Sequence, residues 1–170
     1  MRTIKFRAQD IASNKWLYGD IRHHKNDVCI FEQGGNKGEL VKPETIGQLT
    51  GLTDKNGKEI YEGDIIKWYE IGHSNHDVLE PPEDYIKEYL DVVEFLGGTF
   101  CVGREEAPSL IPVEFLTEEW QANDDDMFKW VQNTDEYPNI TIDDMYICEV
   151  VGNVHDNPDL IEKGGDDGRD

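Results

Sequence analysis

The stretch Leu40–Tyr69, LVKPETIGQLTGLTDKNGKEIYEGDIIKWY, decides the fold of this chain. Its centre is the pair Asn56-Gly57, which favours a type I′ hairpin turn because both central residues of that turn need positive φ. We therefore expect a tight hairpin with its tip at Asp54–Lys58. Short strands separated by glycine-centred turns favour a small, strongly bent sheet or barrel over a layer of parallel strands and helices.

Two further strands are predicted beside this hairpin. Residues 45–50 form one that ends at Gly51, and Glu62-Gly63-Asp64 makes a turn into a β-branched and aromatic strand at 65–69. A Gly-Asp pair before two isoleucines resembles the strand entry of small SH3-like barrels. The expected fold class is therefore mainly β, with strongly bent sheets or an SH3-like barrel and a minor helical content.

Alternation of polar and apolar residues predicts strands before the central stretch as well. Ile4, Phe6 and Ala8 alternate with basic residues, residues 15–24 place alternate side chains on opposite faces, and residues 28–31 are apolar. These segments predict a continuous β meander over the first seventy residues.

The chain after residue 70 is less regular and more acidic. Residues 83–89 have apolar positions at roughly helical spacing and predict a short helix after a Pro-Pro pair. Gly97-Gly98 predicts a second hairpin between apolar runs. Residues 126–133 predict another short helix, and 145–154 predict a strand.

The central stretch contains the run Thr-Gly-Leu-x-Asp-x-Asn-Gly-Lys-x-Ile-Tyr-Glu-Gly-Asp-Ile, from Thr50 to Ile65. Together with an opening segment at 4–19 and a closing segment at 151–160, this run resembles the YopX family of phage- and prophage-encoded proteins. The resemblance covers residues 1–69 and 145–161. It implies a mainly β protein of the host cytoplasm, of uncharacterised function, and it supplies no catalytic residue and no cofactor.

This resemblance sets the expected organisation of the chain. One YopX-like unit spans 1–161: residues 1–69 and 145–161 form the β core, and 70–144 form an acidic insertion with a hairpin and short helices. Residues 162–170 are expected to be a disordered tail. The residues of the central motif, for which we expect structural roles, are Thr50, Gly51, Leu52, Asp54, Asn56, Gly57, Tyr61, Glu62, Gly63 and Asp64.

Charge is distributed unevenly along the sequence. The chain has 16 basic and 37 acidic residues, a net charge of −21. Residues 1–70 contain 11 basic and 11 acidic side chains, so residues 71–170 contain the other 5 basic and 26 acidic ones and carry the whole net charge. This charge opposes binding to nucleic acid, since affinity for phosphates comes largely from cationic contacts.

Composition also bears on the compartment. The sequence has no apolar run near the roughly 20 residues that a membrane-spanning helix needs, and its first ten residues lack the apolar core of a signal peptide. Cys29, Cys101 and Cys148 are an odd number and widely spaced, which is typical of buried thiols in a reducing cytosol. We expect a cytoplasmic protein without membrane association.

The candidate metal sites are weak. His73 and His76 have ligand spacing, yet no second ligand pair lies nearby, and His23 and His24 point to opposite faces of a predicted strand. The acidic triplet Asp124, Asp125 and Asp126 lacks the glycine and closing glutamate of an EF-hand and suits a helix N-terminus or a solvated surface. We expect no metal and no cofactor, and we retain the triplet only as a candidate binding surface.

Two classes of function follow. The first is a non-enzymatic interaction protein whose acidic part engages a basic surface of a protein partner, although acidity also confers solubility by itself. The second is a small enzyme or ligand-binding barrel with its site in 70–144. The sequence has no Gly-x-Ser-x-Gly motif and no phosphate-binding loop, which favours the first class. Exposed strand edges leave self-association open.

Overall fold

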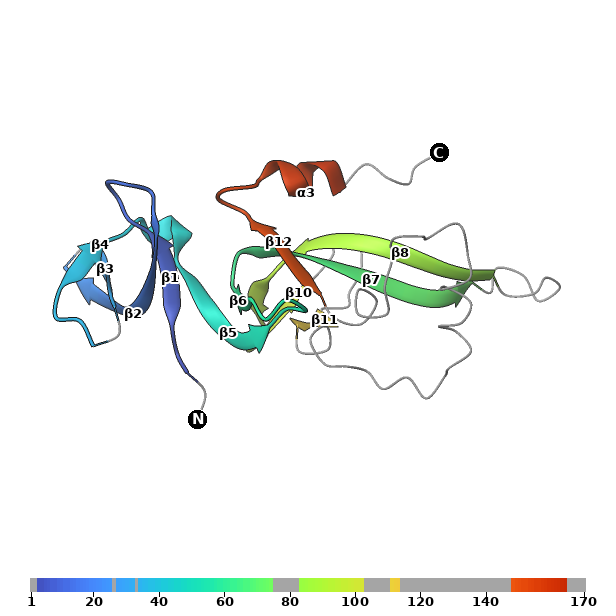
Figure 1. Cartoon of the computed structure of the whole chain (residues 1–170), viewed down its shortest axis with the longest axis horizontal. Helices are drawn as coiled ribbons and strands as arrows, with labels where there is room; N and C mark the ends of the chain where they lie inside the picture. The colour runs from blue at the N-terminus through green and yellow to red at the C-terminus, as the bar shows by residue number, and fades with distance from the viewer. Residues whose placement is uncertain are drawn as a thin grey trace.

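The computed structural model describes residues 3–25, 27–32, 34–74, 83–102, 111–113 and 148–164. The described part is built from antiparallel strands, and the mainly β fold class is confirmed. An N-terminal sheet lies at one end of the long axis and a β-ribbon extends toward the other end, with the strand β5 running between them (Figure 1).

The N-terminal sheet has six strands in the order β4-β3-β2-β1-β5-β6. These strands are β1 (Phe6–Gln9), β2 (Trp16–His24), β3 (Asp27–Phe31), β4 (Gly38–Leu40), β5 (Gly47–Thr53) and β6 (Glu59–Tyr61). The strands predicted at 15–24 and 28–31 are confirmed, and the first strand overlaps the alternating segment at 6–8 and extends to Gln9. The meander holds only through β4, because β5 returns to pair with β1. The 3₁₀ helix η1 (Pro43–Thr45) precedes β5, so the strand predicted from residue 45 begins at Gly47.

The two faces of this sheet have different chemistry, because residues directly opposite in neighbouring strands share a face. Ala8 lies opposite Leu17, and both belong to a hydrophobic cluster on one face. Arg7 lies opposite Tyr18 and Gln9 opposite Trp16, on the other face. The members of the first cluster are Ala8, Val28, Ile30 and Val41, with Leu17, Ile21 and Ile46 packed against them. The polar face is therefore the one available to contact the rest of the chain.

The central hairpin is present between β5 and β6, but its turn differs from the prediction. Gly57 has φ of +76°, whereas Asn56 is not among the residues of positive φ. The Gly57 N–H donates to the Asp54 carbonyl at 2.9 Å, and the Asp54 N–H donates to the Lys58 carbonyl at 2.9 Å. This is a three-residue loop, a type I turn followed by a left-handed glycine. The type I′ assignment was wrong because the loop is one residue longer than the Asn-Gly pair suggests.

Strands β7 (Asp64–Ser74) and β8 (Glu83–Val92) form a long ribbon, paired without interruption from Ile65↔Val92 to Ser74↔Glu83. The strand predicted at 65–69 is confirmed, and the short helix predicted at 83–89 is wrong. Pairing with β7 gives every second residue of β8 its backbone hydrogen bonds, and the Trp68 ring stacks on Tyr89 at a centroid distance of 4.9 Å. Tertiary pairing therefore overrides the helical spacing of the apolar residues.

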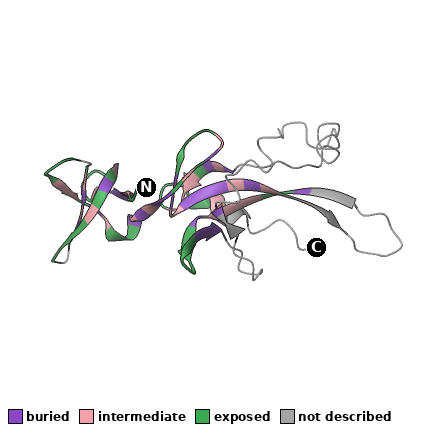
Figure 2. Cartoon of the chain, turned by 90° about the horizontal axis from the view of Figure 1, so that it is seen from below, coloured by how far each residue is buried: buried purple, intermediate pink, exposed green. Residues whose placement is uncertain are grey.

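The predicted second hairpin is confirmed between β9 (Glu94–Leu96) and β10 (Thr99–Val102), which also pairs with β11 (Ile111–Pro112). Gly97 and Gly98 both have positive φ, +61° and +92°, as a type I′ turn requires. This hairpin contributes to a second hydrophobic cluster. Its members are Ile60, Ile66, Trp68, Val93, Phe100, Val102, Val113, Cys148 and Val150, with Leu52 and Tyr89 packed against them. In Figure 2 the buried positions run along the strands, and exposed positions gather at hairpin tips.

The closing part of the chain returns to the centre of the molecule. Strand β12 (Glu149–Asn153) pairs with the start of β7 and confirms the described part of the strand predicted at 145–154. The helix α3 (Asp159–Gly164) follows, so the first three residues of the tail predicted at 162–170 belong to a helix. The other tail residues and the helix predicted at 126–133 lie outside the described residues. No described helix is long and apolar enough to cross a membrane.

A closed SH3-like barrel is the part of the fold prediction that was wrong, because the sheets in the described part of the chain are open. An isolated bridge between Asp10 and Val41 brings the end of β4 back toward the end of β1. This single bridge does not continue into a β4–β1 ladder that would close the sheet. The edge of β1 that β4 would need is already paired with β5, at Phe6 and Arg7.

Candidate functional site

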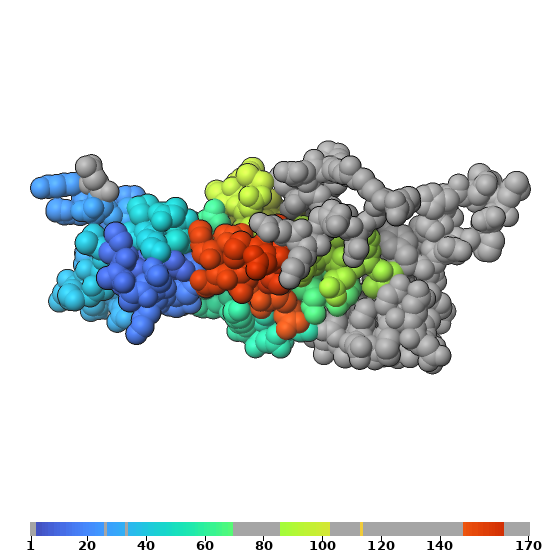
Figure 3. Space-filling view, turned by 90° about the horizontal axis from the view of Figure 1, so that it is seen from above, coloured from blue at the N-terminus to red at the C-terminus, as the bar shows by residue number. Residues whose placement is uncertain are grey.

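Three segments that are distant in sequence meet where the N-terminal sheet adjoins the second half of the molecule. They are residues 7–16, 61–64 and 153–156. In the space-filling view, the closing segment lies between the N-terminal sheet on one side and β7 and β8 on the other (Figure 3). We call this meeting point the junction. Its polar and aromatic residues are Arg7, Gln9, Trp16, Tyr61, Asp64, Asn153 and Asp156.

An ion pair between Arg7 and Asp64 forms the centre of the junction. Arg7 Nη1 lies 2.5 Å from Asp64 Oδ1, and the side chains are 7% and 1% exposed. Arg7 Nη2 also donates to the Glu62 carbonyl at 3.2 Å. Both charges are removed from water, so either one left alone would be destabilised by the cost of desolvation. The pair therefore fixes β1 against the start of β7.

Aromatic rings enclose the guanidinium group of Arg7. Its central carbon lies 4.9 Å from the Trp16 ring centroid and 5.0 Å from that of Tyr61. Within the described residues Arg7 Nε has no hydrogen-bond partner. A Cβ atom on Gly47 would come 3.6 Å from this nitrogen and 2.3 Å from the Glu62 carbonyl oxygen, so only glycine allows this close approach.

The carboxylate of Asp64 is held by opposing effects. Burial raises its pKa above the usual range of an aspartate, and the charge of Arg7 and the hydrogen bond from the Tyr61 N–H act in the other direction. The Tyr61 N–H donates to Asp64 Oδ2 at 2.8 Å. One carboxylate oxygen of Asp64 therefore accepts a hydrogen bond from Arg7, and the other accepts one from a backbone amide. Both oxygens have a structural role.

Asp156 connects the closing segment to the N-terminal sheet. Its carboxylate accepts hydrogen bonds from Trp16 Nε1 at 2.7 Å, Gln9 Nε2 at 3.0 Å and Asn153 Nδ2 at 2.8 Å. The hydrogen bond from Asn153, followed by that from Trp16, lowers the pKa of Asp156 below its usual range despite partial desolvation. The charged form of Asp156 is the one that binds the two parts together.

A second carboxylate, that of Asp54, organises the central hairpin. Asp54 Oδ1 accepts from the Asn56 and Lys58 amides at 2.8 and 2.9 Å, inside the loop. Asp54 Oδ2 accepts from the Val150 amide of β12 at 3.0 Å. One buried side chain thus shapes the turn and attaches it to a strand almost a hundred residues later.

The other motif residues also have structural contacts. Thr50 Oγ1 donates to the Ile60 carbonyl at 2.8 Å and accepts from the Leu52 amide at 3.1 Å, which braces the irregular pairing of β5 with β6. Gly51 and Gly63 have φ of +89° and +80°. Gly63 also receives the Val154 amide and donates to the Val93 carbonyl, so it joins the closing segment to the ribbon.

Aromatic residues of the neutral part divide between core and surface. Tyr61 and Trp68 are buried, Tyr18 is 44% exposed, and the Lys67 ammonium lies 6.0 Å from the Tyr69 ring. Burial, followed by the hydrogen bond to Glu59, raises the pKa of Tyr61 to about 12. Tyr61 is therefore a protonated structural residue at neutral pH.

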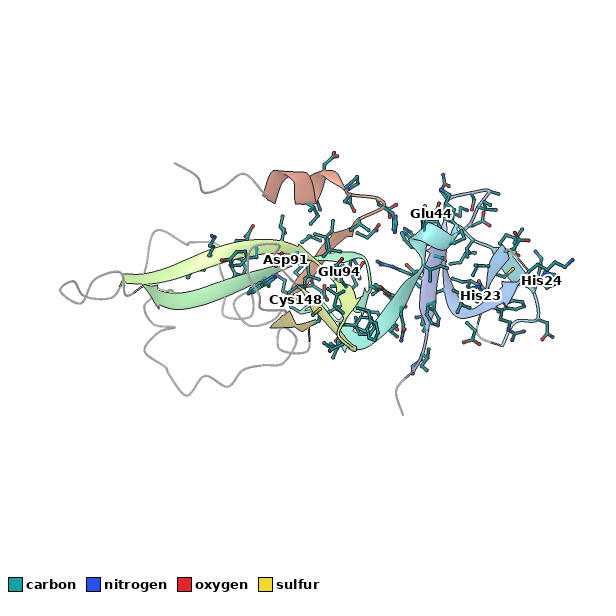
Figure 4. All side chains as sticks on the ribbon, turned by 180° about the vertical axis from the view of Figure 1, so that it is seen from behind. His23, His24, Glu44, Asp91, Glu94 and Cys148 are labelled. Carbon is teal, nitrogen blue, oxygen red and sulfur yellow. The ribbon has the colours of Figure 1, made fainter. Side chains whose placement is uncertain are left out.

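The remaining sequence candidates do not come together. Figure 4 places His23 and His24 at the far end of the N-terminal sheet, well away from Asp91, Glu94 and Cys148. Burial and the nearby charge of Asp54 raise the pKa of Cys148 to about 12, so its thiol is not a nucleophile at neutral pH. Within the described ranges no group of three metal-ligating side chains is present.

Several predicted residues lie where the structure is not described. The acidic triplet Asp124, Asp125 and Asp126 and the residue His76 are among them. Conversely, sequence analysis missed Arg7, Gln9 and Asp156 as residues of one site. Local sequence contains no signal for their convergence, since Asp156 is separated from Gln9 by 147 positions.

The chain is thus a small, mainly β protein whose open sheets meet at a polar junction. The chain belongs to the YopX family: the family model described as "YopX protein" matches residues 5–162. A comparison with curated proteins gives no match.

A solved structure with similarity to this chain is "Crystal structure of protein EF1440 from Enterococcus faecalis". The two share 19% sequence identity at a TM-score of 0.42, over 95% of this chain and 99% of that chain. Similarity at this level carries no functional argument.

Proposed function

We propose that the protein is a non-enzymatic interaction module that engages a basic surface of a protein partner in the cytoplasm of a bacterial host. The observation that carries this proposal is the separation of charge along the chain. Residues 1–70 are neutral, and residues 71–170 carry the net charge of −21. Such a field attracts and orients a cationic partner and excludes anionic ones.

The described part of the second half keeps the same sign of charge. Residues 83–102 contain five acidic residues and one lysine, and residues 148–164 contain four acidic residues and one lysine. Strands β8 and β10 and the helix α3 lie on the side of the junction away from β1–β4 (Figure 1), whereas Asp156 lies in the junction itself. The acidic residues described in the second half therefore lie mostly apart from the neutral strands β1–β4, which supports a directional contact with a basic surface.

The hydrogen bonding of three carboxylates and the burial of one thiol support a non-catalytic role. The carboxylates of Asp54, Asp64 and Asp156 each accept at least two hydrogen bonds from protein groups. The buried thiol of Cys148 is protonated at neutral pH. These groups hold the fold together, and a catalytic acid, base or nucleophile would need to be free to react.

Affinity capture tests this proposal. The immobilised chain is exposed to a bacterial lysate at 50 and 200 mM salt, beside an unrelated protein of matched size and net charge, and retained proteins are identified by mass spectrometry. We expect one basic protein to be retained by this chain at both salt concentrations and not by the control. If this chain and the control retain the same basic proteins, and these are lost as the salt rises, the acidity serves solubility only and the proposal is overturned.

A further inference from the structure

We infer that the outer edge of β8 is a strand-addition site for an extended, lysine-rich segment of the partner. This inference rests on the proposed function and adds to it a location and a backbone-directed mode of binding. In strand addition, main-chain hydrogen bonds provide affinity, and contacts of alternate side chains provide specificity.

The geometry of β8 suits this mode. Strand β8 pairs with β7 through ten consecutive positions and is the outermost strand of the order β12-β7-β8. In an antiparallel ladder, every second residue points its N–H and C=O groups away from its neighbour. In the described part of the chain no further strand receives these groups of β8.

The edge of β8 lacks three of the features that block strand addition. Natural edges are protected by proline, bulges, short length, charged side chains or a covering helix or loop. Strand β8 contains no proline, its register with β7 is unbroken, and its one lysine is Lys87. The helix α3 lies beside β8 near β12, and the ribbon projects well beyond that helix (Figure 1). The projecting part is therefore the stretch of edge that an added strand would use.

The charge of β8 selects a basic occupant. Its ten residues include the acidic residues Glu83, Asp84, Glu88 and Asp91 against Lys87. A second copy of this chain is a poorer occupant. Antiparallel self-pairing centred on Lys87 and Glu88 would set Asp84 opposite Asp91 of the other copy, and each chain has a net charge of −21. Lysines of an added strand would instead face carboxylates such as that of Glu88, which is exposed and accepts one hydrogen bond, from the Tyr69 hydroxyl at 2.7 Å.

The test uses a ten-residue peptide of alternating lysine and valine, labelled with a fluorophore, and the full chain. A matched peptide has the same sequence with alternate residues N-methylated, so that it keeps its charge and loses the amide donors of one edge. We expect the first peptide to bind at least about tenfold more tightly at 150 mM salt, since several backbone hydrogen bonds at roughly 1 kcal/mol each are lost on methylation.

A variant of β8 locates the site. Glu88→Lys should weaken binding of the first peptide about fivefold or more, from the loss of one charge pair and the gain of a repulsive one. Glu39→Lys, with the same charge change on β4, should leave binding unchanged. Equal losses in the two variants would mean binding to overall charge and would overturn the β8 site.

The remaining outcomes separate this inference from the proposed function. Equal binding of the two peptides would overturn strand addition and leave a charge-directed interaction module. Failure of both peptides to bind at 50 and 150 mM salt would overturn this inference, and a specific basic protein captured from lysate would still support the proposed function. A stable homodimer broken by Lys87→Pro would assign the edge to a second copy and overturn the inference.

Discussion

At the scale of single residues, the fold depends on a few buried charges. Arg7 and Asp64 come from strands 57 positions apart and are almost completely shielded from water. Such a pair contributes little net stability relative to apolar residues of the same volume, yet losing one partner leaves an uncompensated charge. The pair therefore acts mainly by excluding arrangements in which β1 and β7 are apart.

Replacement of one member of this pair should be costly. We expect Asp64→Leu to lower the free energy of unfolding by about 3–5 kcal/mol, because Arg7 stays buried without its counter-charge. The double variant Arg7→Leu with Asp64→Leu should be more stable than the single variant, since it removes both charges. Urea unfolding followed by circular dichroism measures both effects.

A surface pair provides the control for this experiment. Lys37 and Glu39 also form a close ion pair, but their side chains are 84% and 47% exposed. Glu39→Gln should leave the urea midpoint unchanged, because water screens exposed pairs. A wild-type midpoint for Asp64→Leu as well would show that the junction charges do not hold the sheets together.

At the scale of elements, turns decide where the strands lie. The three-residue loop between β5 and β6 needs a left-handed residue at Gly57, and nothing lies within 4 Å of a Cβ added there. Space is therefore not the constraint at this position, and backbone conformation is. The same requirement appears twice in succession at Gly97 and Gly98, where the loop is shorter.

Substitutions at Gly57 separate these two constraints. Gly57→Val should cost more than about 1 kcal/mol of stability, because a β-branched side chain disfavours positive φ. Gly57→Asn adds a side chain of comparable size that tolerates this conformation, and it should cost distinctly less. Thermal unfolding compares the two variants, and equal losses would remove backbone strain as the cause.

Sequence reasoning succeeded where structure is local and failed where it depends on distant partners. The Gly97-Gly98 turn and the strand alternation around Leu17 follow from neighbouring residues alone. The helix predicted at 83–89 failed because the partner of β8 is β7, whose pairing outweighs the spacing of three apolar residues. The junction was not predicted for the same reason, since nothing near Arg7 in sequence indicates a carboxylate at Asp64.

At the scale of the whole molecule, the two hydrophobic clusters belong to the two parts that meet at the polar junction. The first cluster packs on the apolar face of the N-terminal sheet, and the second is formed mainly by side chains of β7, β10 and β12. Strand β5 pairs with β1 at Gln48 and reaches the second cluster at Leu52, so one strand contacts both halves. This continuity predicts that the two halves unfold together.

Native-state hydrogen exchange measures this coupling. The slowest backbone amides of β3 and of β7 should exchange with the same free energy in the wild-type chain, as one cooperative unit requires. In the variant Asp156→Ala, which loses the hydrogen bonds to Gln9 and Trp16, the amides of β3 should exchange faster than those of β7. Different free energies in the wild-type chain would show that the halves unfold independently.

The long reach of Asp156 also bears on how the protein is made. A ribosome that adds about 5–20 residues per second completes Gln9 on the order of ten seconds before it reaches Asp156, which lies 147 positions later. During that interval Gln9 and Trp16 on the polar face of the N-terminal sheet lack the carboxylate that accepts their hydrogen bonds. Final assembly therefore waits until the closing segment has been synthesised, and a chain that stops before this segment exposes a surface that quality-control proteases and chaperones can recognise.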